Sequence, residues 1–296
     1  MARVVRMHQD EVETDAGLVR RLLASQFPEW ADLPIERVPS AGTDNAMYRV
    51  GTDVAVRLPR IDWAIESIEK EQKWLPVLAP RLPLPVPCPV AFGEPEAVFP
   101  YPWSVVPWLA GEVATLDRLD DPVRAAHDLA SFVKALREIE PRNGPRHHRG
   151  SPVRSQDGAL RRNVAHLRGE LDESAVLDAW SRVLEAPDYD GKPVWFHGDL
   201  AYFNLLAHDG ALSAVIDWGT CGVGDPAIES IVAWSLFPPR AREAYRDSLG
   251  IDDATWERGK GWVLTGIAGV GYYRRTNPSL VADKVTAIKA VLGEMT

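Results

Sequence analysis

The sequence has 296 residues, of which 46% are hydrophobic and 25% are charged, and its formal net charge at pH 7 is −9. These values are typical of a globular protein that is long enough for two lobes, each with its own core. The negative charge argues against binding to nucleic-acid phosphates. The first residues contain no apolar run typical of a signal peptide, and the longest nearly apolar stretch, residues 261–273, is too short to span a bilayer. We therefore expect a cytoplasmic protein that binds neither nucleic acid nor a membrane.

The first hundred residues predict a small mixed β-sheet with flanking helices. Apolar spacing indicates helices at residues 14–27 and 65–78, and strands at residues 46–50 and 54–58 with a turn between them. Five prolines between residues 80 and 89 predict an extended connector after the second helix, because proline does not continue a helix.

After residue 121 the pattern changes to helices. Pro122 occupies a favourable first helical position, and Pro141 ends the same helix. Further helical spacing covers residues 158–168, 174–184, 226–236 and 253–273. The second part of the chain is therefore predicted to be mainly helical.

Three oxygen-bearing side chains lie inside this helical part, with Asn204 and Asp217 placed 5 and 18 residues after Asp199. The spacing suits magnesium-dependent phosphoryl transfer. Asp199 would orient a hydroxyl nucleophile and accept its proton. Asn204 and Asp217 would bind Mg²⁺, which prefers oxygen ligands and is completed by water and nucleotide phosphates. The alternative is that all three residues only form turns and helix caps.

The residues between Asn204 and Asp217 predict a β-hairpin. An apolar stretch follows Asn204, the turn-forming residues His208, Asp209 and Gly210 come next, and residues 211–216 form a second apolar stretch. This hairpin would return Asp217 to the neighbourhood of Asn204.

The segment HGDLAYFN at residues 197–204, followed by IDWG and GDPA, resembles the catalytic core of the aminoglycoside phosphotransferase family, relatives of choline kinases and protein kinases. Residues 40–50, 54–60, 68–90 and 101–112 resemble that family's nucleotide loop, third strand, helix with connection, and strand with hinge. The resemblance implies an α+β, bilobal, protein-kinase-like fold. It implies a nucleotide-binding N-terminal lobe at residues 1–108, a hinge near residues 106–111, and a helical C-terminal lobe at residues 109–296 that carries the catalytic loops and the acceptor site.

The resemblance also implies a nucleotide loop. Ser40, Gly42, Thr43 and Asn45 would lie over the phosphates through backbone N–H groups and a hydroxyl. The loop has one glycine, whereas a protein-kinase loop has three.

The phosphate-contacting residue departs from the family pattern. Arg57 stands where related kinases have a strand lysine, and Glu71 stands at the position of the helix glutamate that pairs with it. Arginine keeps the positive charge but has a wider donor fork, so the phosphate contact must differ. The alternative is that Arg57 and Glu71 form a structural ion pair.

The hinge is implied to bind the purine through the backbone. Pro107 would supply a carbonyl acceptor and Leu109 an N–H donor, so the N–H that proline lacks is not needed. The implied phosphate donor is ATP, with GTP as the alternative, and the implied cofactor is Mg²⁺.

Two residues are implied to support the catalytic loop. His197 would pack against the loop and brace it instead of transferring a proton. Asp225 would accept backbone N–H bonds from the catalytic loop while Pro226 opens a helix. Glu229 would either contact the substrate or occupy a solvated helix position.

The short interval after Asp217 argues against a peptide acceptor. Gly219 is followed by Gly-Asp-Pro-Ala within eight residues, which leaves no room for the long segment that holds a peptide in protein kinases. We therefore predict an ATP-dependent O-phosphotransferase for a small hydroxylated molecule, with an aminoglycoside, macrolide or nucleoside antibiotic as the favoured acceptor and resistance as the consequence. The alternatives are a metabolic kinase for choline, another amino alcohol or a sugar-like acceptor, and a catalytically silent nucleotide-binding module. The acceptor pocket is expected from residues 157–184 and the C-terminal helices, with no individual substrate residue assigned.

Overall fold

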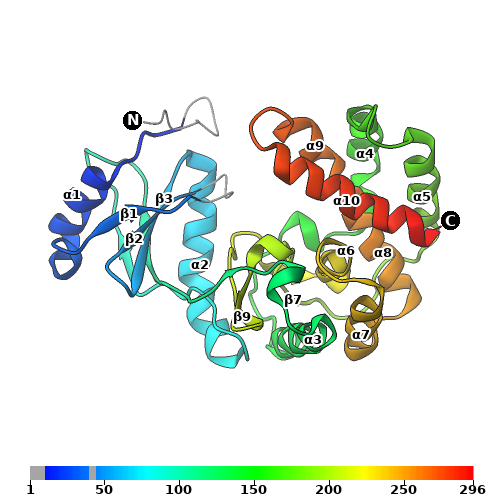
Figure 1. Cartoon of the computed structure of the whole chain (residues 1–296), viewed down its shortest axis with the longest axis horizontal. Coiled ribbons are helices and arrows are strands. Elements are labelled where there is room, and N and C mark those ends of the chain that lie inside the picture. The colour runs from blue at the N-terminus through cyan, green and yellow to red at the C-terminus, as the bar shows by residue number, and fades with distance from the viewer. Residues whose placement is uncertain (1–10, 40–44, 296) are drawn as a thin grey trace. The chain divides into compact units, whose positions relative to one another are not determined.

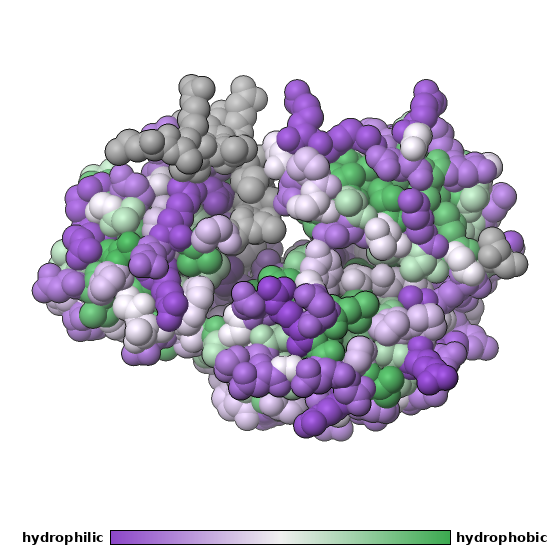
Figure 2. All heavy atoms as spheres, in the orientation of Figure 1, coloured by the Kyte–Doolittle hydropathy of each residue, from purple (hydrophilic) through white to green (hydrophobic). Residues whose placement is uncertain are grey.

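The computed structural model describes residues 11–39 and 45–295 of the chain (Figure 1). The chain divides into two compact units. The first extends to residue 80 and includes residues 85–110, and the second contains residues 81–84 and continues from residue 111. The boundary after residue 110 falls within the segment predicted as the hinge. Hydrophilic residues dominate the visible face of each unit (Figure 2).

A five-stranded sheet forms the centre of the first unit, in the order β1-β2-β3-β5-β4. All pairings between neighbouring strands are antiparallel. The two strands predicted from the sequence are present as β2 and β3. The strands are β1 (Ile35–Arg37), β2 (Asn45–Val50), β3 (Val54–Pro59), β4 (Ala91–Gly93) and β5 (Trp103–Pro107).

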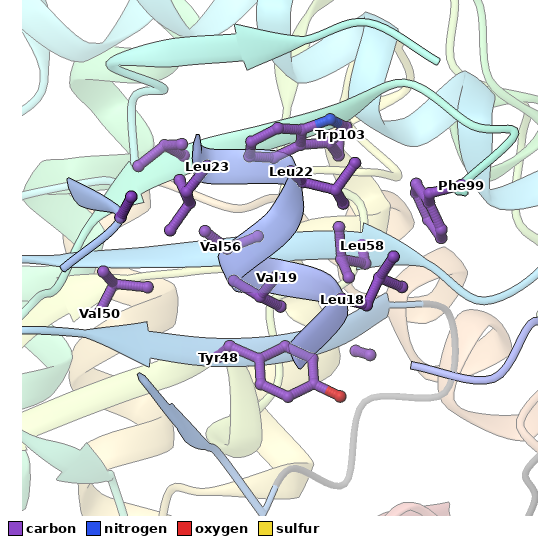
Figure 3. Packing of buried hydrophobic residues seen from close by; sticks show 13 residues of the cluster. Leu18, Val19, Leu22, Leu23, Tyr48, Val50, Val56, Leu58, Phe99 and Trp103 are labelled. Carbon is purple, nitrogen blue, oxygen red and sulfur yellow. The ribbon is translucent and has the colours of Figure 1, made fainter. Parts of the chain in front are cut away.

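Helix α1 (Ala16–Gln26) covers one face of this sheet. Asp15 caps the helix by accepting the Leu18 N–H at 2.6 Å. The buried face of the helix lies against side chains of β2, β3 and β5 (Figure 3). Burying one such aliphatic side chain contributes about 1.5–3 kcal/mol, so this face attaches the helix to the sheet. The packed residues include Leu18, Val19, Leu22, Leu23, Tyr48, Val56, Leu58 and Trp103.

Helix α2 (Ile65–Leu78) has the bounds predicted from its apolar spacing. Its buried residues include Ile68, Leu75 and, on the same side, Glu71. A buried carboxylate must find a partner inside the protein, because losing water costs several kcal/mol or more without one. We therefore expect a cationic side chain of the sheet to lie beside Glu71.

The second unit is mainly helical, and α9 and α10 lie side by side (Figure 1). Asp121 caps α3, the helix predicted to begin at Pro122, by accepting the N–H groups of Val123 and Arg124. The helices are α3 (Pro122–Glu138), α4 (Asp157–Asn163), α5 (Glu173–Glu185), α6 (Ile231–Ser235), α7 (Pro239–Leu249), α8 (Asp253–Leu264), α9 (Ile267–Tyr273) and α10 (Pro278–Met295).

Two small antiparallel sheets lie within this helical unit. One contains β6 (Glu112–Val113), β8 (Leu205–His208) and β9 (Ala211–Val215) in the order β6-β8-β9. The other pairs β7 (Val194–Phe196) with β10 (Gly222–Gly224). The segments between these strands carry the residues of the catalytic pattern.

Three predicted helices are each divided in the structure. Residues 158–168 form α4 followed by the 3₁₀ helix Val164–Leu167. Residues 226–236 form the 3₁₀ helix Pro226–Ser230 followed by α6, and residues 253–273 form α8 and α9 with a turn at Thr265 and Gly266. The apolar spacing continues through these breaks, so periodicity alone does not reveal them. All three segments remain helical in type, and the predicted α+β fold class is confirmed. Among the described residues, no helix combines the length and the hydropathy needed to cross a bilayer.

Candidate functional site

The hairpin predicted after Asn204 is present as β8 and β9. Asp209 and Gly210 form its turn, with φ values of 49° and 76°. At the open end, the Ile216 N–H donates to the Asn204 carbonyl at 2.9 Å. Asp217 directly follows this hydrogen bond, so the hairpin brings the backbones of Asn204 and Asp217 into the same neighbourhood.

Asp199 lies in a loop that requires glycine at the preceding position. Gly198 has a φ of 87°, and a Cβ there would lie 2.6 Å from the Thr220 carbonyl oxygen. The Gly198 N–H donates to Oε1 of Glu229 at 2.9 Å. The close approach of the Thr220 carbonyl and the hydrogen bond to Glu229 therefore fix the backbone next to Asp199.

Arg149 reaches the same loop from a distant segment of the chain. Its Nη1 donates to Asp199 Oδ1 at 2.7 Å and to the Gly198 carbonyl at 2.8 Å. Burial alone would raise the pKa of Asp199, but the positive charges of Arg149 and Lys284 outweigh it and hold this pKa below its usual range. Asp199 is therefore a carboxylate at neutral pH. Its side chain is 26% exposed, so the carboxylate remains accessible.

Asn204 and Asp217 differ in exposure. Asn204 is buried, and its amide nitrogen donates to the Asp199 carbonyl at 2.8 Å and to Asp199 Oδ2 at 3.2 Å. Asp217 is exposed and has a φ of 64°, in the left-handed region that aspartate tolerates better than most residues. Such backbone outliers are concentrated at functional sites.

The donor set of these two residues fits a phosphate-bound magnesium ion. Within residues 11–39 and 45–295, no group of three or more His, Cys, Asp or Glu side chains is arranged to hold a metal ion. Magnesium does not require one, because one amide oxygen and one carboxylate suffice when water and phosphates complete the coordination. Asn204 carries the amide oxygen, and the exposed Asp217 leaves space for the remaining ligands.

His197 is buried, and backbone groups contact both of its ring nitrogens. Nε2 lies 2.9 Å from the Ile216 carbonyl, and Nδ1 accepts the Asp199 N–H at 3.3 Å. The tautomer that carries a proton on Nε2 and a lone pair on Nδ1 satisfies both contacts. The ring also packs edge-on against Trp218, with 4.8 Å between ring centroids. This arrangement supports bracing of the loop, the role that the resemblance implies.

Asp225 has partners other than those expected. Its Oδ1 accepts the Ala227 N–H at 2.9 Å, and Arg258 donates to Oδ2 at 2.8 Å and to Oδ1 at 3.3 Å. The expected bonds from N–H groups of the catalytic loop are therefore wrong for this side chain, because the buried guanidinium occupies the carboxylate instead. The Asp225 N–H donates to the Gly150 carbonyl at 3.0 Å, so Asp225 supports the segment that carries Arg149.

The carboxylate that accepts an N–H from the catalytic loop belongs to Glu229. This residue is fully buried, and burial raises its pKa. Neither a substrate contact nor a solvated helix position describes it. The 3₁₀ helix at residues 226–230 turns the side chain inward, a geometry that α-helical spacing does not predict.

The nucleotide residues predicted in the first unit are described only in part. Ser40, Gly42 and Thr43 lie outside the described residues. Asn45 begins β2 opposite Pro59 of β3.

Arg57 and Glu71 form a buried ion pair between β3 and α2. Arg57 Nη1 donates to Glu71 Oε2, and the two side chains are 7% and 1% exposed. The cation that Glu71 requires is thus Arg57. The pair links strand to helix, and a guanidinium has more donors than one carboxylate uses. Both the structural and the phosphate-contacting role are compatible with this geometry.

The predicted hinge follows β5. Pro107 ends the strand opposite Val54 of β3. The next N–H, that of Trp108, donates to the Asp53 carbonyl at 2.8 Å. Leu109, the predicted donor to the purine, follows as a partly buried residue.

A cavity of about 310 Å³ lies beside Asp199 in the second unit. Its apolar and aromatic walls include Phe203, Ile231, Trp262 and Ala268. The C-terminal helices contribute to the lining as expected, whereas residues 157–184 do not, since Gln156 is the last lining residue of its segment. The volume is at the lower end of the range for small-molecule sites.

Apart from Asp199, the charged residues of this cavity and Tyr202 were not predicted as site residues from the sequence. Tyr202 donates to Asp283 Oδ2 at 2.5 Å, and Lys284 lies beside Gly269. Arg149 belongs to the segment RNGPRHHRG, which reads as a polar loop. Tyr202 fills a variable position of the segment HGDLAYFN, whereas the other three residues belong to no motif and lie far along the chain from Asp199, so only the folded structure brings them together.

Comparison with solved structures shows the same fold. The GDP complex of wild-type aminoglycoside 2′-phosphotransferase-IIIa is 16% identical, with 96% of this chain and 100% of that chain covered and a TM-score of 0.72. The macrolide 2′-phosphotransferase MphH from Brachybacterium faecium is 22% identical, with 93% and 97% covered and a TM-score of 0.61. A complex of an aminoglycoside phosphotransferase with GDP and kanamycin is 18% identical, with 94% and 99% covered and a TM-score of 0.71.

The comparison with protein families identifies the chain more directly. No curated protein sequence matches it significantly. Residues 35–262 match the phosphotransferase enzyme family, known as APH, and this match spans most of the chain, including every predicted catalytic residue. The chain belongs to the APH phosphotransferase enzyme family.

Proposed function

We propose that the protein is an ATP-dependent O-phosphotransferase that transfers the terminal phosphate to a hydroxyl group of a small molecule. The observation that carries the proposal is the accessible Asp199 carboxylate, which is held by Arg149 at the edge of a 310 Å³ cavity. Membership of the phosphotransferase family supports the reaction type. The proximity of the Asn204 and Asp217 backbones supports a metal-bound phosphate beside this carboxylate.

The geometry supports an orienting role for Asp199. Arg149 binds Oδ1 closely, whereas Asn204 donates a longer hydrogen bond of 3.2 Å to Oδ2, so Oδ2 is the oxygen better placed to accept a further hydrogen bond from the acceptor hydroxyl. A carboxylate of low pKa is a weak base, and it therefore aligns the hydroxyl and takes its proton only as the new bond forms. The acceptor oxygen bonds to the terminal phosphorus, the bridging P–O bond to the leaving diphosphate breaks, and the hydroxyl proton passes to Asp199.

Asn204 and Asp217 would hold Mg²⁺ on the nucleotide phosphates. The bound ion would supply positive charge that neutralises the phosphate oxygens. In the first unit, Arg57 would contact the phosphates, and the backbone of Pro107 and Leu109 would bind the purine. The solved relatives include complexes with GDP, ATP and ADP, which supports a nucleotide as the donor.

We propose an antibiotic as the acceptor. The solved relatives are named as aminoglycoside and macrolide phosphotransferases, and both classes of molecule carry several hydroxyl groups. Modification of such a molecule would confer resistance.

The test uses the purified chain, Mg²⁺ and labelled ATP with a panel of aminoglycosides, macrolides, nucleosides and amino alcohols. Mass spectrometry should identify one class that gains a single phosphate. Modification of amino alcohols alone would point to a metabolic kinase instead. The absence of any phosphorylated product across the panel would contradict the proposal.

The carboxylate role is tested with Asp199→Asn, which should lower turnover by about 10²–10⁴-fold, the usual contribution of a positioned acid or base. Nucleotide affinity should persist. The matched control is Asp209→Asn, because Asp209 is exposed and asparagine tolerates its left-handed backbone equally well. Undiminished turnover in Asp199→Asn would contradict the assignment.

A further inference from the structure

The acceptor cavity contains two carboxylates and two basic side chains. Asp199 and Asp283 are the carboxylates, and Arg149 and Lys284 are the basic residues. Each carboxylate already has a partner within the protein, since Arg149 donates to Asp199 and Tyr202 donates to Asp283. The two carboxylates of the lining are matched in number by two basic side chains, and each carboxylate already accepts a hydrogen bond from the protein.

Lys284 extends into this cavity from α10, across the beginning of α9. A Cβ at Gly269 would lie 2.8 Å from its Cε, so the absence of a side chain at Gly269 makes room for the lysine stem. Lys284 forms no hydrogen bond or ion pair with any residue that the structure describes. Its charge nevertheless acts on the site, because it lowers the pKa of Asp199.

Apolar side chains form a large part of the remaining lining, beside polar residues such as Gln156 and Ser235. The apolar residues include Phe203, Ile231, Trp262, Val263 and Ala287. An apolar wall attracts a ligand by excluding water, whereas an ammonium group buried against it would lose its hydration without gaining a partner.

We propose that Lys284 is a specificity-determining residue that excludes polycationic acceptors, and that the acceptor is a hydroxylated molecule with an apolar face and at most one positive charge. This inference rests on the proposed function and narrows its acceptor class. A polycation would bring ammonium groups beside Lys284 and Arg149, and the repulsion would be strong because the cavity is partly shielded from water. A weakly charged acceptor gains contact with the apolar walls and meets no such repulsion.

The test compares the wild-type protein with Lys284→Met and Lys284→Glu. Two probes are used, a polycationic aminoglycoside (kanamycin) and a macrolide that carries one amine (erythromycin). The measurements are kcat/KM for phosphate transfer at low ionic strength and the equilibrium affinity of each probe by calorimetry in the absence of nucleotide. The matched control is Lys289→Met, which removes an exposed lysine from the same helix.

The wild type should bind and modify the macrolide in preference to kanamycin. Lys284→Glu should shift the affinity ratio toward kanamycin by about tenfold or more, Lys284→Met by less, and Lys289→Met should leave it unchanged. Raising the salt concentration should reduce the shift, because salt screens these charges.

The inference is overturned if wild-type protein prefers kanamycin, if both Lys284 variants keep the wild-type ratio while they remain folded by circular dichroism, or if neither probe binds. The calorimetric result separates this inference from the proposed function. Selective binding without phosphate transfer would contradict the enzymatic proposal and leave the specificity assignment supported.

Discussion

Arg149 Nη1 lies 2.7 Å from Asp199 Oδ1, although the two residues are 50 positions apart in the chain. The same nitrogen binds the Gly198 carbonyl at 2.8 Å, so one guanidinium fixes both the backbone and the side chain of the catalytic loop. The contact sets the ionisation of Asp199 as well as its orientation.

Replacing Arg149 should therefore change the pH dependence of the reaction. Arg149→Met removes a charge that lowers the pKa of Asp199, so this pKa should rise. Because the reaction needs the ionised carboxylate, the acidic limb of the kcat/KM profile should move to higher pH, and kcat should also fall as the carboxylate loses its alignment. The measurement is the pH–rate profile, with Arg146→Met as control, because Arg146 is exposed in the same segment.

The same contact has a consequence for stability. A carboxylate with a depressed pKa stabilises the fold above its unfolded pKa of about 3.9, and this stabilisation is lost as the pH falls through the folded value. Arg149→Met should lessen this acid sensitivity. An unchanged pH–rate profile in the variant would show that Arg149 does not control Asp199.

Asp217→Asn should raise the concentration of Mg²⁺ needed for half-maximal activity by about tenfold or more, because a neutral amide attracts the cation less than a carboxylate does. Asparagine tolerates the φ of 64° at this position, so the backbone should be retained. Activity is titrated with Mg²⁺ at fixed ATP. If the titration midpoint matches that of Asp209→Asn and the wild type, Asp217 is not a metal ligand.

Glu229 should stabilise the catalytic loop as a hydrogen-bond acceptor. Glu229→Gln retains an oxygen for the Gly198 N–H, whereas Glu229→Met leaves that N–H without its acceptor. We expect the methionine variant to lose about 1–3 kcal/mol of unfolding free energy and the glutamine variant to lose less. Urea unfolding at one pH measures the difference, and equal losses would contradict the role.

The pH dependence provides a second check on Glu229. Burial raises the pKa of Glu229 above its unfolded value. As the pH rises between the unfolded and the folded pKa, the unfolded chain loses this proton while the folded chain keeps it, so the stability of the wild type falls. Glu229→Gln cannot ionise. Its Tm relative to the wild type should therefore increase from pH 5 to pH 8, and a constant difference would exclude a raised pKa.

The pair between Arg258 and Asp225 should be essential for folding of the second unit. Both side chains are 3% exposed, and Arg258→Met would leave a buried carboxylate without its cation. Removal of one partner from a buried pair typically costs about 3–5 kcal/mol. The control is Arg154→Met, since Arg154 and Asp188 are 47% and 44% exposed, and such exposed pairs contribute about 0–1 kcal/mol. Similar unfolding midpoints for the two variants would contradict this prediction.

The catalytic hairpin and most helices could be predicted because their signals are local. Turn residues at positions 208–210 lie between two apolar stretches, and Pro122 follows an aspartate that caps α3. The breaks at residues 230 and 265 could not be predicted, because the apolar pattern runs through them without interruption.

The partners of the site residues depend on contacts that are distant in sequence. Asp225 follows a recognisable motif, but its cation lies 33 positions later in α8. Arg149 and Lys284 belong to segments with no motif of their own. A one-dimensional pattern therefore predicts where the chemistry lies, and it does not predict which distant charges surround Asp199.

The residues around Asp199 and several residues of the cavity wall come from different parts of the chain. The match to the family ends at residue 262. The residues whose side chains hydrogen-bond to Asp199 or to the neighbouring Gly198 all lie before that point, namely Arg149, His197, Asn204 and Glu229. Gly269, Asp283 and Lys284 come after it, on the last two helices. Exchange of this terminal helical pair between related enzymes would thus be a route to new acceptors that keeps the hydrogen bonds of the catalytic loop.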